Sequence, residues 1–283
     1  MGTVADQGPQ SPETTRSANT NGEPSEDEGA SDLIQVCRSA TLRRAEYLFY
    51  RELLLAFLAT GAPPDRPTLR TLARRHGVPL EATLARMASE DLVQRDPSTG
   101  AIRAAYPFSG IPTAHRVTLL ADSHASTDPS ADTPVELYAM CALDALGIPL
   151  MLGRDVLVTS VDALTGEAVH VAMRQVHTTQ VSPDVVGDSN GLAGWTASWE
   201  PSTAVVFARP EEHECEGGVA AGSCCPLTNF FVTKEHAERW AAAHGSAEDV
   251  ILSHDEALWR AHTLFVGVLD RLVDVDSVEQ PIH

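Results

Sequence analysis

The sequence predicts an α+β fold in which an N-terminal helical unit of winged-helix type precedes a larger unit that is rich in β-strands. Helical spacing of apolar residues dominates from about residue 40 to residue 90, and short alternating or apolar runs dominate beyond residue 106. A polar segment precedes both. We therefore divide the 283 residues into a disordered acidic tail (1–32), a helical winged-helix-like domain (33–105) and an α+β domain (106–283).

The tail is rich in Ser, Thr, Gly, Pro and acidic residues, and its only large apolar side chains are Met1 and Val4. Such a segment cannot bury enough apolar surface to offset the entropy that folding would cost it. We expect residues 1–32 to be disordered.

The helical unit begins with an amphipathic run from Ala40 to Ala59, which ends at Gly61 and two prolines. A short helix that Gly77 closes and a second helix over 80–89 follow. Residues 91–103 read as a strand, a Gly-containing turn and a strand. Helix, turn, helix and hairpin follow one another in this order in a winged-helix module.

The second unit has apolar or alternating runs that begin at Arg116, Asp155, Ala168 and Thr203 and that predict strands. The sequence Asp162-Ala-Leu-Thr-Gly occupies the turn between two of them. Helices are predicted over Lys234–His244 and Asp255–Leu264, and a polar loop over 176–193.

Composition excludes several classes of protein. No apolar run reaches the roughly 18 residues that a membrane helix needs, and the first 30 residues lack the features of a secretory signal, so we expect a cytoplasmic protein. An odd number of cysteines in a reducing compartment argues against a disulfide framework. The net charge of −19 disfavours nucleic acid and anionic membranes as partners. The five cysteines are Cys37, Cys141, Cys215, Cys224 and Cys225.

The segment Val135–Gly147 contains the first candidate site. Read as a helix from about Ala139 to Leu146, it places Cys141 and Asp144 on one face, where a thiol and a carboxyl group can act on the same substrate atom. The spacing alone favours the simpler interpretation, a buried cysteine beside a solvated aspartate.

The second candidate is Ser223-Cys-Cys-Pro-Leu-Thr-Asn-Phe-Phe. Adjacent cysteines form only a strained disulfide, so a bridge between Cys224 and Cys225 is a poor explanation for the doublet. The pair is either core packing or a source of soft thiolate ligands for a soft metal, and the sequence leaves both open.

These two segments resemble the alkylmercury (organomercurial) lyases, the MerB family. Cys141-Ala-Leu-Asp144 is similar to the catalytic helix of that family, and Cys–x4–Phe-Phe is similar to its second cysteine block. Ala237-Glu-Arg-Trp, the Asp162 turn and Ser253-His-Asp-Glu-Ala follow the family's order and spacing. The resemblance covers about residues 65–262.

The resemblance implies a winged-helix-like unit packed on a mixed β-sheet catalytic domain, with a Cys–Asp–Cys site. Cys141, Asp144 and Cys225 match the catalytic residues. The two cysteines would bind mercury as substrate and product. Counting back from the Phe-Phe pair selects Cys225 as the second thiol, whereas counting from the cysteine doublet selects Cys224; we prefer Cys225, because a slip of one residue would turn every side chain of a strand to its other face.

The implied function is carbon–mercury lyase activity in mercury resistance and detoxification: protonolytic cleavage that gives a hydrocarbon and Hg(II). The implied partners are an organomercurial small molecule, cellular thiols that remove Hg(II), and a mercuric reductase that takes the product. We expect no cofactor, no nucleic-acid partner and no membrane partner.

Two alternatives stay open. A Cys-based metal-sensing or metal-binding protein could use the winged-helix module, with its arginines on phosphates: Arg66, Arg70, Arg74 and Arg75. A zinc site could combine His213 and Cys215 with the cysteine doublet, although the spacing matches no closed tetrahedral pattern. We interpret His76, His115 and His124 as surface histidines. Four aromatic residues are interpreted as core packing rather than pocket lining: Tyr106, Phe108, Trp195 and Trp199.

Overall fold

The computed structural model describes residues 33–35, 41–120, 134–176, 192, 194–209, 224–245 and 249–270. The chain divides into two units, Met1–Asp32 and Leu33–His283, and the described residues all belong to the second. The predicted disorder of the tail lies outside the described residues, as does most of the 176–193 loop. The further division of the second unit near residue 105 stays a prediction.

The helical part begins with the antiparallel pair β1 (Leu33–Gln35) and β2 (Thr41–Arg43), followed by α1 (Arg44–Thr60), α2 (Arg66–Arg75) and α3 (Leu80–Ser89). Gly61 ends α1 in the left-handed conformation at φ 69°, and a Cβ atom there would collide with the carbonyl oxygen of Glu136. Asp65 caps α2 by accepting a hydrogen bond from the Thr68 backbone N–H at 2.9 Å. The predicted order of these helices is confirmed.

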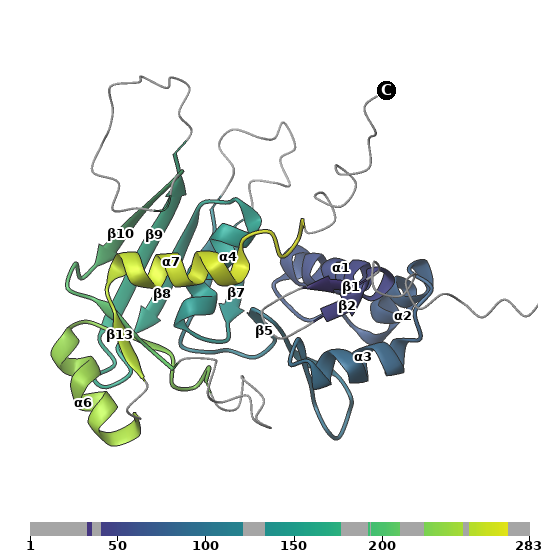
Figure 1. Cartoon of the computed structure of the whole chain (residues 1–283), viewed down its shortest axis with the longest axis horizontal. Coiled ribbons are helices and arrows are strands. Elements are labelled where there is room, and N and C mark those ends of the chain that lie inside the picture. Colours follow the sequence, from purple (N-terminus) through teal and green to yellow (C-terminus); the bar gives the residue numbers. More distant parts are fainter. Residues whose placement is uncertain are drawn as a thin grey trace, which may run out of the picture. The chain divides into compact units, whose positions relative to one another are not determined.

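The largest sheet among the described residues has eight strands in the order β10-β9-β8-β6-β7-β5-β4-β3 (Figure 1). Its strands are β3 (Val93–Arg95), β4 (Ile102–Ala105), β5 (Phe108–Ser109), β6 (Arg116–Leu119), β7 (Val135–Ala139), β8 (Val156–Val161), β9 (Ala168–Gln175) and β10 (Trp195–Glu200). The predicted hairpin of the winged-helix-like unit, β3–β4, forms one edge of this sheet.

The α+β class is confirmed, and one detail of the sheet differs from the expectation. The resemblance implied a mixed sheet, but every described strand pair in it is antiparallel. Tight connections such as the Asp162 turn between β8 and β9 reverse the chain, whereas parallel strands need long crossover connections.

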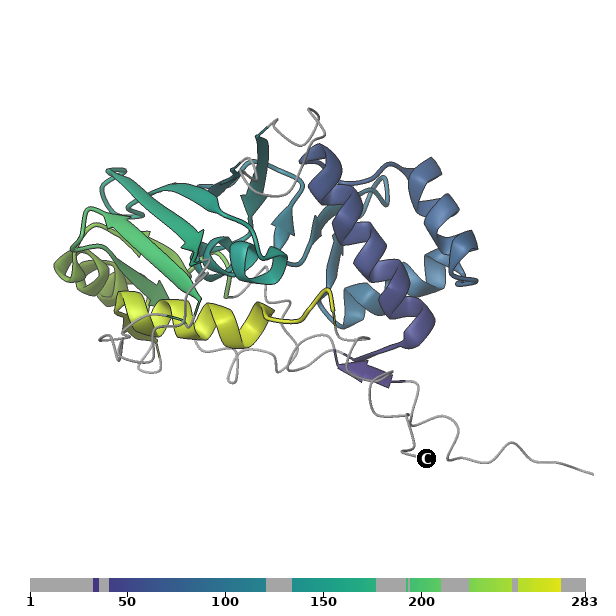
Figure 2. The same ribbon diagram turned by 90° about the horizontal axis from the view of Figure 1, so that it is seen from above.

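A second sheet and three helices complete the described structure. The sheet has the antiparallel order β12-β11-β13, with β11 at Val205–Ala208, β12 at Asn229–Phe231 and β13 at Val250–Leu252. The helices are α4 (Ala142–Leu152), α6 (Lys234–His244) and α7 (His254–Phe265). Helix α7 lies alongside α4 in both views (Figures 1 and 2). None of the helices in the described ranges is long and apolar enough to cross a membrane.

Asp162 connects the two sheets. One carboxylate oxygen accepts the backbone N–H groups of Leu164 (2.8 Å) and Thr165 (3.0 Å) within the β8–β9 turn. The other accepts the backbone N–H of Val232 and lies 2.8 Å from Nδ1 of His236. Burial alone would raise the pKa of Asp162, but these hydrogen bonds hold it below its usual value. The turn thereby holds the end of β12 against the large sheet.

The prediction of a helix from about Ala139 is wrong at its start. Residues 135–139 form β7, which pairs with β6 on one side and β5 on the other, and α4 begins only at Ala142. The alternation of Val135, Leu137 and Ala139 suits a strand, and two partner strands satisfy its backbone groups. The predicted helix over Lys234–His244 and the strands after Arg116, Asp155, Ala168 and Thr203 are confirmed.

The contact between α4 and α7 gives a first prediction. Gly147 lies against the ring of Phe265 so closely that a Cβ atom would overlap it. We expect Gly147→Ala to lower the free energy of unfolding by about 1–3 kcal/mol, because overpacking forces neighbouring groups apart. Denaturant titration measures this change. A double-mutant cycle with Phe265→Leu should show coupling between the positions, and strict additivity of the two effects would contradict the close contact.

Candidate active site

Cys141 is the residue immediately before α4 and acts as its N-cap. Its backbone is extended, with φ −148° and ψ −179°, and its Sγ accepts a hydrogen bond from the Asp144 N–H at 3.5 Å. The predicted juxtaposition of Cys141 and Asp144 is therefore present, although it comes from the capping geometry rather than from two positions inside a helix. Asp144 is only 1% exposed, so the interpretation of it as a solvated residue is wrong.

Cys225 lies in a short turn that leads into β12. The Cys224 carbonyl accepts hydrogen bonds from the N–H groups of Leu227 and Thr228, both at 3.0 Å. The Thr228 carbonyl in turn accepts the N–H of Ala142 at 3.1 Å, which joins this turn to the first residue of α4. This hydrogen bond brings the turn with Cys225, which is 84 positions after Cys141 in the sequence, to the beginning of α4.

The structure brings Cys141, Asp144 and Cys225 together. Their two Sγ atoms and one carboxylate oxygen all lie within 4.8 Å of one another, and the Cys225 Sγ lies 3.9 Å from Oδ2 of Asp144. The two cysteines are 5% and 7% exposed, and both are reduced thiols. In this water-poor space the two thiols can bind one soft metal ion, and the carboxyl group beside them can accept a proton.

Cys224, the alternative second thiol, does not join this cluster. Cys224 is also a buried, reduced thiol, but it is not among the described residues that share the 4.8 Å cluster. Cys37, Cys215 and His213 lie outside the described residues, so the proposed zinc site falls there as well. Among described residues, Cys225 is the member of the doublet that faces Cys141.

The electrostatics of the site favour a protonated thiol at rest. Burial raises the pKa of the Cys141 thiol well above its usual range, and the hydrogen bond with Cys225 and the charge of Asp144 raise it further. The backbone N–H of Asp144 acts in the opposite direction but is the weaker influence. Cys141 therefore needs either a proton acceptor or a bound metal before it becomes a thiolate.

His115 was interpreted as a surface histidine, and this is wrong. It is 3% exposed, its Nδ1 lies 2.9 Å from Oγ of Ser160, and it shares a side-chain hydrogen bond with Asn229. Asn229 donates to the carbonyl of Pro226 at 2.8 Å, so these side chains support the turn that carries Cys225. The signal was present in the sequence, since His115 shares the strand parity of Val117 and other buried β6 positions.

A cavity of about 490 Å³ opens beside this turn. It is lined by Ala88, Val93, Gln94, Arg95, Arg103, Ala104, Ser109, Ile111, Thr113, Met140, Cys225 and Pro226. The four aromatic residues assigned to packing do not line it: Trp199 stacks on His254 with ring centroids 4.2 Å apart, and Tyr106 packs on Phe265. Phe108 is fully buried, and Trp195 packs against the core.

Two thiols and a carboxyl group lie in a buried cluster on an α+β scaffold whose described sheets are antiparallel. This arrangement defines a class of protein that carries out thiolate chemistry on a soft metal. The sequence matches the alkylmercury lyase family, MerB, over residues 108–190 and 188–266, which together span more than half of the chain. The chain belongs to this family.

Curated relatives and a solved structure agree with this assignment. The chain is 28% identical over 192 residues to an alkylmercury lyase of Staphylococcus epidermidis, which covers 68% of this chain and 70% of the relative. It is 28% identical over 205 residues to an alkylmercury lyase of Bacillus cereus, covering 72% and 75% respectively. The fold resembles that of the mercury-bound form of MerB2 with a TM-score of 0.53 and 20% identity, over 81% of this chain and all of that one.

The buried histidine gives a prediction about pH. Burial lowers the pKa of His115 from 6.5 to about 4, against the opposing effect of its hydrogen bond with Asn229. In the unfolded chain His115 binds a proton at a higher pH than it does in the folded chain. The free energy of unfolding should therefore decrease as the pH falls from about 6.5 to about 4. The loss attributable to His115 should be up to about 3 kcal/mol.

The measurement is denaturant unfolding of the wild-type protein and of His115→Gln at a series of pH values. His115→Gln lacks the titrating group, so its stability should fall less steeply over this interval. His262→Gln, at a half-buried position on α7, serves as the matched control for the loss of one histidine. Equal slopes for wild type and His115→Gln would contradict the prediction.

Proposed function

We propose that this protein is an organomercurial lyase that cleaves carbon–mercury bonds by protonolysis at Cys141, Asp144 and Cys225. The observation that carries the proposal is the buried cluster in which the two sulfur atoms and the carboxylate lie within 4.8 Å of one another. Mercury prefers thiolate ligands, and a carboxyl group at this distance can exchange a proton with a bound thiol or with the carbon that mercury releases.

The reaction balances with these three groups. The mercurial arrives as R–Hg–X, where X is a thiolate; one cysteine thiol replaces X, and its proton leaves with X as free thiol. The second cysteine passes its proton to Asp144 and binds the same mercury as a thiolate. Asp144 then delivers that proton to the carbon as the carbon–mercury bond breaks, which forms R–H. Mercury remains Hg(II) throughout, bound to two thiolates.

The remaining features of the function follow from this chemistry. The reaction consumes no electrons and transfers one proton to carbon, so we infer that it requires no cofactor. The bis-thiolate Hg(II) product is stable, and external cellular thiols would release it by exchange. We further infer a cytoplasmic location, where such thiols are abundant, and a mercuric reductase as the recipient of the product.

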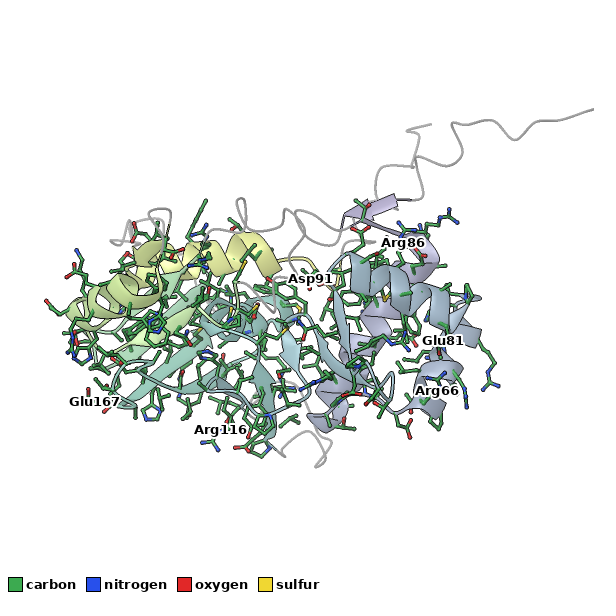
Figure 3. The ribbon with its side chains drawn as sticks, turned by 90° about the horizontal axis from the view of Figure 1, so that it is seen from below. Arg66, Glu81, Arg86, Asp91, Arg116 and Glu167 are labelled. Atoms are coloured by element: carbon green, nitrogen blue, oxygen red, sulfur yellow. The ribbon has the colours of Figure 1, made fainter. Side chains whose placement is uncertain are left out.

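The alternative, a metal sensor that binds DNA through the winged-helix-like unit, receives less support. Two of the arginines that could touch phosphates are already in ion pairs, Arg66 with Glu81 at 2.6 Å (Figure 3) and Arg75 with Glu52 at 2.6 Å. Together with the net charge of −19, these pairs leave little positive potential for a nucleic-acid backbone. The carboxyl group of Asp144 beside the two thiols suits proton transfer, which cleavage requires and metal sensing does not.

The cysteine assignments predict distinct phenotypes. Cys141→Ser and Cys225→Ser should each reduce hydrocarbon release to below about 1% of the wild-type rate, because removing either member of a catalytic unit costs about as much as removing both. Cys224→Ser is the matched control and should keep most of the activity. The measurement is benzene released from phenylmercury in excess thiol, with folding checked by circular dichroism. An inactive Cys224→Ser beside an active Cys225→Ser would shift the register by one residue.

The role of Asp144 separates cleavage from metal binding. Asp144→Asn should bind Hg(II) with the wild-type stoichiometry, since both thiols remain, but should cleave phenylmercury at least about 100-fold more slowly because it lacks a transferable proton. Equilibrium dialysis measures binding, and single-turnover benzene release measures cleavage. Wild-type turnover in this variant would assign proton delivery to another group.

A further inference from the structure

The cavity beside the turn of residues 224–228 reaches one member of the cluster. Cys225 and its neighbour Pro226 line the cavity, whereas neither Cys141 nor Asp144 is among its described lining residues. Cys141 instead lies between the end of β7 and the first turn of α4. A molecule that arrives through this space therefore meets Cys225 before it meets Cys141 or Asp144.

The wall of the cavity suits an organic group. Its apolar side chains include Ala88, Val93, Ala104, Ile111 and Met140, which come from α3, the β3–β4 hairpin and the segments that flank β5 and β7. A volume of about 490 Å³ is well above the roughly 150 Å³ of an apolar cavity that accepts benzene. A phenyl or alkyl group bonded to mercury fits this space while its mercury lies at Cys225.

We propose that Cys225 is the thiol that receives the mercurial, that the cavity holds the organic group, and that Cys141 binds the mercury second. This order deepens the proposed function and rests on it. In the first step the Cys225 sulfur forms a bond to mercury as the incoming thiolate leaves, and the Cys225 proton departs with that thiolate as free thiol. No other reactant is required.

The hydrogen-bond geometry of the cluster is compatible with this order. The Cys225 Sγ lies 3.9 Å from Oδ2 of Asp144, so a mercury atom bound to that sulfur is close to the carboxyl group that later protonates the carbon. The Cys141 Sγ instead accepts the N–H of Asp144 as the cap of α4, and Cys141 is not among the described residues that line the cavity. Because the two sulfur atoms lie within 4.8 Å of one another, the Cys141 sulfur can reach a mercury atom that is held at Cys225.

Trapping of single-thiol adducts tests the order. Phenylmercury is added to Cys141→Ser and to Cys225→Ser, each combined with Cys224→Ser so that the doublet contributes only one thiol. The reaction is quenched at short times, and adducts on each cysteine-containing peptide are quantified by mass spectrometry, which also separates Cys37 and Cys215. Adduct formation on Cys225 should proceed at the rate seen when both thiols are present. Adduct formation on Cys141 alone should be at least about tenfold slower, because access limits thiol exchange.

The route is tested by narrowing the cavity. Ala88→Leu adds bulk to its wall from α3, and Ala85→Leu places the same substitution at an exposed position of that helix as the matched control. Ala88→Leu should slow the labelling of Cys225 by phenylmercury several-fold and affect methylmercury much less, while Ala85→Leu should change neither rate. Both variants replace alanine by a residue that favours helix, so folding is preserved.

Two results would overturn the proposal: labelling of Cys141 in the absence of Cys225 at a rate equal to or above that of Cys225, or unchanged phenylmercury labelling in Ala88→Leu. Neither readout depends on cleavage, because an adduct forms before the carbon–mercury bond breaks. Ordered labelling without benzene release by the wild-type protein would refute the lyase function and leave the order of the thiols intact.

Discussion

The hydrogen bond from the Ala142 N–H to the Thr228 carbonyl, 3.1 Å long, is the contact on which the site depends. It joins the first residue of α4 to the turn that carries Cys225, and so it sets the distance between two thiols that are far apart in the sequence. Asp162 fixes the other end of the short β12 strand by accepting the N–H of Val232. The turn of residues 224–228 and β12 are thus held at one end by a backbone–backbone hydrogen bond and at the other by a side-chain carboxylate.

Burial shapes the chemistry of this cluster as well as its geometry. A thiol that is removed from water keeps its proton, and burial accordingly raises the pKa of Cys141. Before substrate binds, the site therefore does not hold two thiolates. Deprotonation of Cys141 is then linked to the arrival of a soft metal that prefers sulfur ligands. Asp144 belongs to the same buried space, so a proton given up by a thiol can stay beside the bond that is to be broken.

The sequence predicted the elements whose signals are local. The helix Lys234–His244 begins after the N-cap Thr233, and its boundaries required no tertiary information. The spacing of Cys141 and Asp144 also placed them together, although the helix begins at Ala142 rather than near Ala139, where β7 ends. What could not be predicted from local pattern was long-range: the support of the Cys225 turn by Asn229 and His115, and the approach of that turn to α4, arise from the pairing of distant strands.

The β3–β4 hairpin, which the sequence analysis assigns to a winged-helix-like unit, belongs to the same eight-stranded sheet as the strands that follow it. This sheet runs from β3 at one edge to β10 at the other. Separate folding modules normally meet through side chains and can melt one after the other, whereas strands of one sheet lose their partners together. Unfolding of α1–α3 together with the β3–β4 hairpin would thus expose the backbone of β5 as a new edge, which favours aggregation. A chain that lost these helices and the hairpin during evolution would therefore need a new strand or cover beside β5. This requirement favours inheritance of the helical part and the rest of the sheet together.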